Sequence, residues 1–286
     1  MKRLLIGIIA ILAVCALNLR AEDQPKTEAP ANAAQSTPKP GDADYPAPSA
    51  DARHTQKVAA VKSGKYDLVL IGDSITHTLD KFGGAYAKLE DTWNKHFAPR
   101  NAINLGHNGF RTEQILWCLQ NGELDFAQSP KVFMILIGTN NSDDRHFKKV
   151  HTAAEILVGT KAIVDAIKQR HPTSKILVLR IFPRGNDSEK SAVKWSFNSS
   201  KQCIETCQKA GELTAKLADA KQVFWLDINH IFMRPDGTIN TDLMWDLLHP
   251  SPAGAEAWAH AVEPTLAQLM GDKPTVDAPA AADKRD

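Results

Sequence analysis

The chain has 286 residues, of which 43% are hydrophobic and 23% charged, a composition typical of a globular protein with one large domain or two small ones. Its formal net charge is +1, and the 31 basic and 33 acidic residues that remain without residues 1–21 give −2. The chain therefore lacks the basic field with which proteins bind nucleic acid or anionic lipid.

The N-terminal segment, residues 1–21, has the layout of a secretory signal peptide. Two basic residues precede an apolar run from Leu4 to Leu17, which is short for a membrane span, and Ala21 suits the last position before cleavage. We therefore expect a secreted or periplasmic protein. The alternatives are lipidation at Cys15 and an uncleaved N-terminal anchor, and only these two would bring the chain into contact with a membrane.

One folded domain is expected over residues 54–271. Residues 22–53 and 272–286 are rich in small, charged and Pro residues without an apolar period, so we interpret them as a disordered tether and a disordered tail. Inside the domain, the expected strands are Asp67–Ile71, Ala102–Leu105, Val132–Ile137, Lys175–Leu179 and Val223–Leu226. Helical patterns lie near 86–97, 112–121, 152–170, 198–218 and 253–270. This alternation predicts an α/β fold with a parallel sheet flanked by helices.

The cysteines offer no zinc-type spacing. Cys15 leaves with a cleaved signal peptide, and Cys118, Cys203 and Cys207 remain. The last two are four residues apart on a predicted helix, a geometry that strains a disulfide. We interpret the three as small buried residues, with a bridge between two of them as the alternative.

A serine follows the first predicted strand directly. The run Leu68–Ile71 is apolar, Gly72 ends it, and Asp73 and Ser74 come next. In open α/β sheets, ligands bind beyond the carboxyl ends of the strands, so the Ser74 hydroxyl is expected to face a ligand. Taken alone, the stretch is equally typical of a polar turn without chemistry.

Two further strand ends carry polar loops. Gly106–Thr112 contains two glycines, which let a backbone N–H approach a ligand, but its spacing does not match a dinucleotide-binding fingerprint. After the strand near 132–137, Asn140 is placed to aim its side-chain NH₂ into the same cleft. Each loop by itself is also typical of a turn or helix cap.

Near the C-terminus, Asp246 and His249 are three residues apart and share a face of a turn or helix. The acid can hold the imidazole in one tautomer while the other ring nitrogen acts as a base, although in isolation the pair is also typical of a surface ion pair. Combined, the motifs predict Ser74 as nucleophile, His249 as general base and Asp246 as its orienting acid. The amides of Ser74 and Gly109 and the side chain of Asn140 would form an oxyanion hole.

These motifs, in this order, resemble those of the SGNH hydrolases, the GDSL esterase family. The matching stretches are Gly72-Asp73-Ser74-Ile75, Asn104–Gly109, Gly138-Thr139-Asn140 and Asp246-Leu247-Leu248-His249. Within the family, the chain is most similar to the catalytic subunits of intracellular platelet-activating factor acetylhydrolase. That likeness rests on Ile115–Leu124, Ile181–Gly185 and His249–Gly254, and the similarity covers residues 66–269.

The resemblance implies a flavodoxin-like three-layer α/β/α sandwich with a five-stranded parallel sheet. It implies hydrolysis of esters with small acyl groups, without a cofactor, and no clustered metal-ligand set is visible in the sequence. It assigns Ser74, Asp246 and His249 to the catalytic triad, and Ser74, Gly109 and Asn140 to the oxyanion hole.

The leader distinguishes this chain from those cytosolic subunits, so we expect an exported enzyme acting on a small acyl ester, with acetylated carbohydrate as the first choice. Asp73, Phe110 and Trp245 are the expected substrate contacts; Phe110 stands where close relatives have an acid. A homodimer is compatible with the sequence. The rival interpretations are a lysophospholipase or thioesterase of the same fold, and a non-catalytic carbohydrate- or protein-binding module.

Four other side chains are weaker candidates. His77 and His107 would line the cleft, and Arg111 and Arg184 would meet an anionic substrate, but solvated side chains are the default interpretation at such loops.

Overall fold

The computed structural model describes residues 48–186 and 188–274. The expected signal peptide, residues 22–47 of the expected tether and residues 275–286 of the expected tail lie outside the described residues. Within the described part, none of the helices combines the length and the apolar character that a membrane span requires.

Five parallel strands form one sheet in the order β2-β1-β3-β4-β5. Their bounds are Leu68–Gly72 for β1, Ala102–Gly106 for β2, Val132–Leu136 for β3, Lys175–Leu179 for β4 and Val223–Leu226 for β5. Each strand lies within one residue of its predicted position. The central strands are buried along their whole length, as apolar, β-branched runs in a doubly covered sheet should be.

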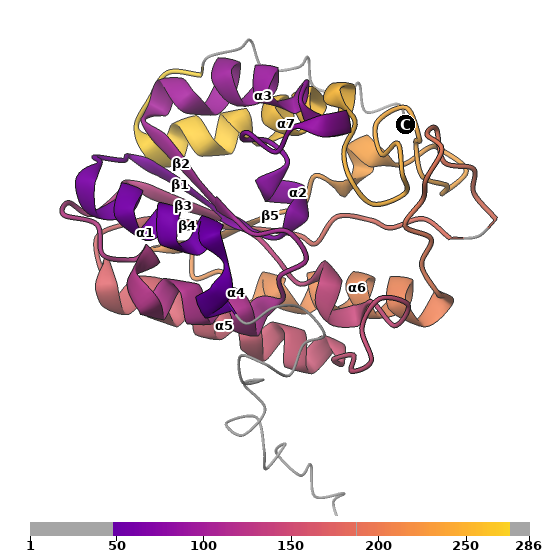
Figure 1. The fold of residues 1–286 in the computed structure, drawn as a ribbon, viewed down its shortest axis with the longest axis horizontal. Helices are drawn as coiled ribbons and strands as arrows, with labels where there is room; N and C mark the ends of the chain where they lie inside the picture. The colour runs from indigo at the N-terminus through magenta and orange to yellow at the C-terminus, as the bar shows by residue number, and fades with distance from the viewer. Residues whose placement is uncertain (1–47, 187, 275–286) are drawn as a thin grey trace, which may run out of the picture. The chain divides into compact units, whose positions relative to one another are not determined.

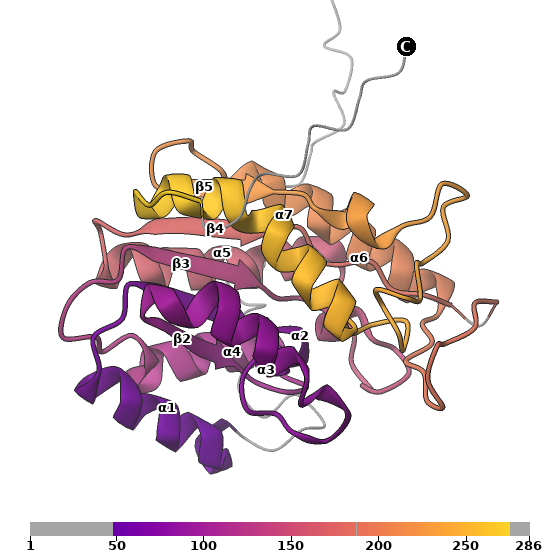
Figure 2. The same cartoon turned by 90° about the horizontal axis from the view of Figure 1, so that it is seen from above.

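Helices cover both faces of the sheet, so the predicted three-layer α/β/α fold is confirmed (Figures 1 and 2). One face carries α1 (Ala52–Ser63), α4 (Thr112–Cys118), α5 (Ala153–Arg170) and α6 (Lys201–Thr214). The other carries α3 (Leu89–Thr92), the helical turn η3 (Trp93–Phe97) and α7 (Pro252–Met270). The short helix α2 (Ser74–His77) follows β1.

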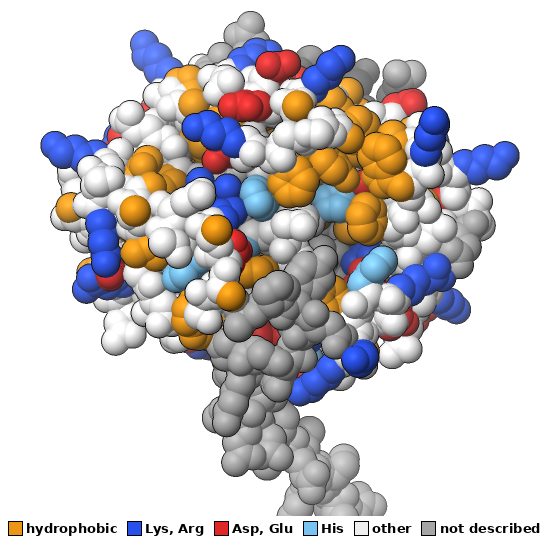
Figure 3. Space-filling model, viewed as in Figure 1, with side chains coloured by type: hydrophobic (Ala, Val, Ile, Leu, Met, Phe, Trp, Pro, Cys, Tyr) orange, Lys and Arg blue, Asp and Glu red, His pale blue; other side chains and the backbone are white. Residues whose placement is uncertain are grey.

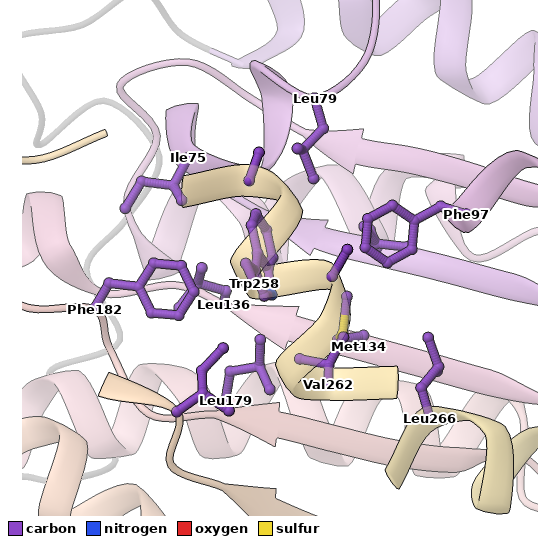
Figure 4. Close-up of a cluster of buried hydrophobic side chains, with 14 of the residues drawn as sticks. Ile75, Leu79, Phe97, Met134, Leu136, Leu179, Phe182, Trp258, Val262 and Leu266 are labelled. Carbon is purple, nitrogen blue, oxygen red and sulfur yellow. The ribbon is translucent and has the colours of Figure 1, made fainter. Parts of the chain in front are cut away.

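Two apolar cores lie on either side of the sheet, because successive strand residues point to opposite faces. Leu68 and Leu70 of β1 join the core under α3 and α7, whereas Val69 and Ile71 join the core under α1, α4 and α5. Trp258 of α7 is the largest fully buried side chain and lies among residues of α7, β3 and β4 in the first core (Figure 4). The two cores thus cover both faces of the sheet.

Helix α1 begins inside the segment expected to be a disordered tether, so the expected boundary at residue 53 is corrected. The side chain of Asp51 caps the helix by accepting a hydrogen bond from the Arg53 amide at 2.8 Å. Only His54 and Val61 of this helix are buried, so it shows little of the apolar period that marks a helix in a sequence. The expected helix near 86–97 is also divided, into α3 and η3.

The three cysteines of the described chain, Cys118, Cys203 and Cys207, are free and buried. The interpretation as small buried residues is therefore confirmed, and the alternative of a disulfide among them is wrong in this structure.

Candidate active site

Residues from four separate segments meet beyond the carboxyl ends of the strands. Ser74 opens α2 immediately after β1, and Gly109 lies in the loop between β2 and α4. Asn140 lies in the helical turn η6 (Thr139–Ser142) that follows β3, and His249 lies in the turn before α7. The parallel sheet brings these loops together because all its strands end at the same edge.

The Ser74 hydroxyl and the His249 imidazole are in direct contact. Ser74 Oγ lies 2.8 Å from His249 Nε2, and His249 Nδ1 lies 2.9 Å from Asp246 Oδ2. Because a carboxylate only accepts, Nδ1 carries the proton and Nε2 is left to accept the hydroxyl hydrogen of Ser74. This is the tautomer in which an imidazole can remove the proton of a serine.

The Asp246 carboxylate is fixed by four donors. Its Oδ1 accepts the backbone N–H groups of Leu248 (3.0 Å) and His249 (2.6 Å), and its Oδ2 accepts Tyr86 Oη–H at 2.9 Å besides His249 Nδ1. Burial opposes ionisation of Asp246, but the bonds from His249 and Tyr86 hold its pKa below the usual range. The acid therefore stays ionised beside the imidazole.

Tyr86 was not found from the sequence. It lies 160 residues before Asp246, on the turn η2 (Gly84–Tyr86), and no local pattern links the two. Burial and the neighbouring Asp246 carboxylate raise the pKa of Tyr86, so its hydroxyl remains a donor.

The loop at Ser74 is tightly packed. A Cβ at Gly72 would lie 2.4 Å from the Leu136 carbonyl oxygen, so only glycine fits where β1 ends. Asp73 caps α2 by accepting the Ile75 amide at 3.0 Å, and burial raises the pKa of Asp73 to about 6. Its side chain is 1% exposed, so the structure places this expected substrate contact inside the loop rather than at a surface.

The other two expected oxyanion donors flank Ser74. Gly109 has a φ of 74°, a left-handed conformation that favours glycine. One hydrogen of Asn140 Nδ2 bonds the Phe110 carbonyl oxygen at 2.9 Å, which leaves the second for a ligand. Ser74, Gly109, Asn140 and His249 all line one pocket.

That pocket has a volume of about 130 Å³, and its remaining walls are mixed: Phe147, Phe197 and Leu248 are apolar, and Asn108, Asp143 and His146 are polar. The ring of Phe197 lies 5.0 Å from the His249 ring, and Tyr86 lies 5.5 Å from it. The Trp245 ring lies 5.6 Å from the Tyr86 ring, and the Trp195 ring lies 6.4 Å from the Trp245 ring. Tyr86, Trp245 and Trp195 together form an aromatic rim beside the pocket. Hydrophobic side chains gather beside two histidines in the middle of the face in Figure 3.

The three expected substrate contacts thus occupy different places. Trp245 belongs to the aromatic rim next to Trp195, which is 41% exposed. Phe110 is buried and stacks on His107 with ring centroids 4.9 Å apart, so its ring packs in the core beneath the loop. A substrate contact through Asp73 or Phe110 would require these buried side chains to move.

Arg111 and Arg184 are buried and bind protein groups rather than facing solvent. Arg111 Nη1 donates to the Lys149 carbonyl oxygen at 2.7 Å, and Arg184 Nη2 donates to Asp143 Oδ2 at 2.7 Å. The suggestion that they meet an anionic substrate therefore has no support in their positions.

Two side-chain groups of the described chain have ligand atoms close enough together for a metal ion, and both lie apart from Ser74. One comprises His54, Cys118 and Glu123, and the other His96, Glu256 and His260. In the first, Glu123 Oε1 already accepts His54 Nδ1 at 2.8 Å. In the second, the Lys95 ammonium contacts the Glu256 oxygen that both histidines share.

The parallel sheet and the contact between Ser74 and the His249 imidazole at its carboxyl edge define a hydrolase with a serine at its centre. The GDSL-like lipase/acylhydrolase family model matches residues 70–257, and the chain belongs to that family. It is accordingly an ester hydrolase.

Relatives support the same assignment. The chain is 31% identical over 227 residues to the platelet-activating factor acetylhydrolase IB subunit alpha1 of Pongo abelii, covering 79% of this chain and 86% of that protein. It is 30% identical over 222 residues to the alpha2 subunit of Mus musculus, covering 78% and 85%. The resemblance stated from the motifs is thus confirmed.

Solved structures share the fold at low identity. A GDSL-like lipase from Bacteroides thetaiotaomicron has a TM-score of 0.60 at 14% identity, covering 76% of this chain and 96% of that one. A carbohydrate acetylesterase family member from Sinorhizobium meliloti has a TM-score of 0.52 at 19% identity, covering 72% and 100%.

Proposed function

We propose that this chain is an exported serine esterase that removes small acyl groups, acetyl first among them, from carbohydrate. The observation that carries the catalytic part is the 2.8 Å contact between Ser74 Oγ and His249 Nε2, with Asp246 on the opposite ring nitrogen. A binding module of the same fold has no use for this chain of contacts.

In the proposed reaction, His249 Nε2 takes the hydroxyl proton as Ser74 Oγ attacks the ester carbonyl carbon. The carbonyl oxygen becomes an oxyanion facing the amides of Ser74 and Gly109 and the second hydrogen of Asn140 Nδ2. The proton on His249 then passes to the departing alcohol, which leaves an acyl group on Ser74. Water gives a proton to the same imidazole and attacks this acyl-enzyme, and the acid departs as Ser74 regains its hydrogen.

The pocket size supports a small acyl group. At about 130 Å³, it is well below the roughly 300–1,000 Å³ of pockets that enclose drug-sized ligands. Phe147, Phe197 and Leu248 border it with bulky side chains. An acetyl group suits this space, whereas a long acyl chain would need these side chains to move.

The aromatic rim supports a sugar as the alcohol part. Tyr86, Trp245 and Trp195 form a continuous series of rings leading away from His249. Such rings offer flat apolar faces together with polar edges, which suits the alternating CH and OH faces of a pyranose. The name of the Sinorhizobium meliloti neighbour, a carbohydrate acetylesterase family member, agrees with this choice.

Export is supported by the sequence alone, through the basic start, the apolar run Leu4 to Leu17 and Ala21. N-terminal sequencing of the protein recovered from its native compartment tests it. A mature chain that begins at residue 22 is expected, and a cytosolic chain that retains Met1 would contradict export.

The decisive test of the catalysis compares wild type with Ser74→Ala on p-nitrophenyl acetate. Wild type should release a burst of nitrophenol equal to the enzyme concentration, followed by steady turnover, and an organophosphonate should label Ser74. Both the burst and the labelling should vanish in Ser74→Ala. Retained labelling in that variant, or no turnover by wild type, would reject the assignment.

A series of nitrophenyl esters separates the proposed acyl preference from its rival. For an acetylesterase, kcat/KM should fall as the acyl chain grows from acetate through butyrate to octanoate. A rise along the series would favour the lysophospholipase or thioesterase. A panel of acetylated sugars, phospholipids and acyl thioesters then identifies the alcohol part.

A further inference from the structure

The loop that carries Gly109 rests on a part-buried cluster of charged side chains at the start of α1. Arg53 Nε donates to the Gly106 carbonyl oxygen at 2.7 Å, and Arg53 Nη2 donates to the Asn104 carbonyl oxygen at 3.2 Å. Asp51, whose Oδ1 caps α1, places its Oδ2 3.1 Å from His107 Nδ1. The start of α1 therefore holds the end of β2 and the loop that follows it.

The opposite edge of the His107 ring is held as firmly. His107 Nε2 lies 2.9 Å from Glu123 Oε1, and the same oxygen lies 2.8 Å from His54 Nδ1 of α1. His107 and Glu123 are 0% and 1% exposed, so water does not compete for these bonds. A closed ring of contacts thus runs from α1 through His107 and Glu123 back to α1.

His107 acts here as a cation. Both of its ring nitrogens face carboxylate oxygens, which only accept, so both nitrogens must carry hydrogen. Burial opposes this charge, but the bonds to Asp51 and Glu123 outweigh it and raise the pKa of His107.

A second histidine holds the same loop from the side of α2. The backbone N–H of Asn108 donates to His77 Nδ1 at 3.2 Å, so this nitrogen is unprotonated. Burial, with the nearby Arg53 and His107 charges, lowers the pKa of His77 to about 3, which keeps it an acceptor. The two residues that precede Gly109 are therefore each tied to a different element.

We propose that α1, through Asp51, Arg53 and His54 together with Glu123, is a positioning device that fixes the oxyanion loop at residues 106–110 for catalysis. The family model begins at residue 70, so this helix lies outside the part of the chain that it matches. The catalytic half of the proposal rests on the proposed function, because Gly109 has this role only in an acyl-transferring enzyme. None of these residues touches the pocket around Ser74. They act through the backbone carbonyl groups of Asn104 and Gly106 and through the side chain of His107.

The expected effect is on turnover rather than on binding. The oxyanion forms only after Ser74 has attacked, so a displaced Gly109 amide weakens contacts to the transition state and leaves ground-state contacts intact. Displacements near 1 Å in such sites reduce rates by about 100-fold. We call the contacts of Asp51, Arg53, His54 and Glu123 with this loop the clamp. In variants that break the clamp, we expect kcat to fall by about 10- to 100-fold, with KM changed by less than about threefold.

The test uses Arg53→Met and His107→Gln, with Arg100→Met as the matched control. Arg100 is a buried arginine, paired with Glu263 by two hydrogen bonds of 2.9 Å and 2.7 Å. It precedes β2 and therefore lies at the opposite end of that strand from Gly106. His107→Gln retains a donor toward Glu123 and loses the bond to Asp51, so its effect should be the smaller of the two.

Three measurements are made on each full-length variant: kcat and KM on p-nitrophenyl acetate, thermal unfolding, and hydrogen–deuterium exchange of the amides at 106–110. In Arg53→Met, kcat should fall and loop exchange should rise. Arg100→Met should lose thermal stability while both kcat and loop exchange stay at wild-type values.

Unchanged kcat in Arg53→Met overturns the catalytic role of the clamp, and unchanged loop exchange overturns the clamp itself. Equal losses of kcat in Arg53→Met and Arg100→Met would show that α1 contributes to stability only and does not position the loop for catalysis. If wild type shows no turnover at all, the proposed function fails, and the exchange data alone then decide whether α1 orders the loop.

Discussion

Two turns of this protein have the same Asp-x-x-His spacing and nearly the same local geometry, yet only one contacts the serine. Asp246 Oδ1 accepts two amides of its own turn, and Asp143 Oδ1 likewise accepts the amides of Arg145 and His146, both at 3.1 Å. In each turn the Oδ2 lies close to the histidine Nδ1, at 2.9 Å for His249 and 3.0 Å for His146. Both histidines line the pocket.

The turns differ in what surrounds them. The fourth partner of the Asp246 carboxylate is the neutral Tyr86 hydroxyl, whereas that of Asp143 is the buried Arg184 guanidinium at 2.7 Å. The His249 side chain is 6% exposed with its Nε2 on Ser74, while the His146 side chain is 47% exposed. The Asp143 carboxylate is thus paired with a buried cation, whereas the Asp246 carboxylate has only a neutral hydroxyl in that place. The Asp-x-x-His spacing thus produces the carboxylate–imidazole contact in both turns. The residues around each turn determine whether the histidine contacts Ser74.

The sharpest test of this comparison replaces each histidine. His249→Asn should reduce kcat on the order of 10⁴-fold or more, because the Ser74 proton then has no acceptor. His146→Asn should reduce kcat by less than about tenfold, since an exposed side chain on a neutralised carboxylate contributes mainly to the pocket wall. Steady-state kinetics on p-nitrophenyl acetate measures both, and comparable losses would show that the two turns share the chemistry.

Replacing the acids should separate catalysis from stability. Asp246→Asn should reduce kcat by about 10⁴-fold, because an amide can hold the imidazole in the wrong tautomer. Asp143→Asn leaves the Arg184 guanidinium buried without its ionic partner, and such losses reduce the free energy of unfolding by about 3–5 kcal/mol. Kinetics and urea denaturation of both variants check this division. A catalytic loss in Asp143→Asn as large as that in Asp246→Asn would contradict it.

The same comparison shows what the sequence could predict. The five strands and the residues at their ends follow from local apolar runs, and the sheet then brings Ser74 and His249 together over 175 positions. The spacing of Asp143 and His146 equals that of Asp246 and His249, so spacing alone could not rank the two turns. The assignment of Asp246 and His249 rested on the order of the motifs and on the family resemblance, in addition to their spacing.

What could not be predicted depends on tertiary contacts without a local period. Tyr86 reaches Asp246 across 160 residues, and α1 buries too few side chains to show a helical stripe. Phe110 follows a glycine of the loop as a substrate contact would, but its ring stacks on the buried His107. The positions of these residues depend on packing against elements that are distant in the sequence. A local stretch of sequence does not contain that information.

The smallest expected effect concerns the fourth partner of Asp246. Tyr86→Phe removes one hydrogen bond to the carboxylate, for which a loss of about 1 kcal/mol corresponds to a roughly fivefold lower kcat/KM if the bond matters in the transition state. The pKa of Asp246 is held below its ordinary value of 3.8 partly by this bond. Its stabilising effect is therefore fully present above pH 3.8 and lost as pH falls through the lowered pKa of the folded protein.

Wild type and Tyr86→Phe should accordingly differ in the free energy of unfolding at pH 7, and the difference should shrink below pH 4. Urea denaturation across this range measures it, with Tyr66→Phe as the control, since Tyr66 packs against Phe126 and not against the triad. A difference that grows toward low pH would mean that the hydroxyl supports the protonated acid. In that case the neutral partner would not be what distinguishes Asp246 from Asp143, and burial of His249 against Ser74 would be left as the feature that makes one turn catalytic.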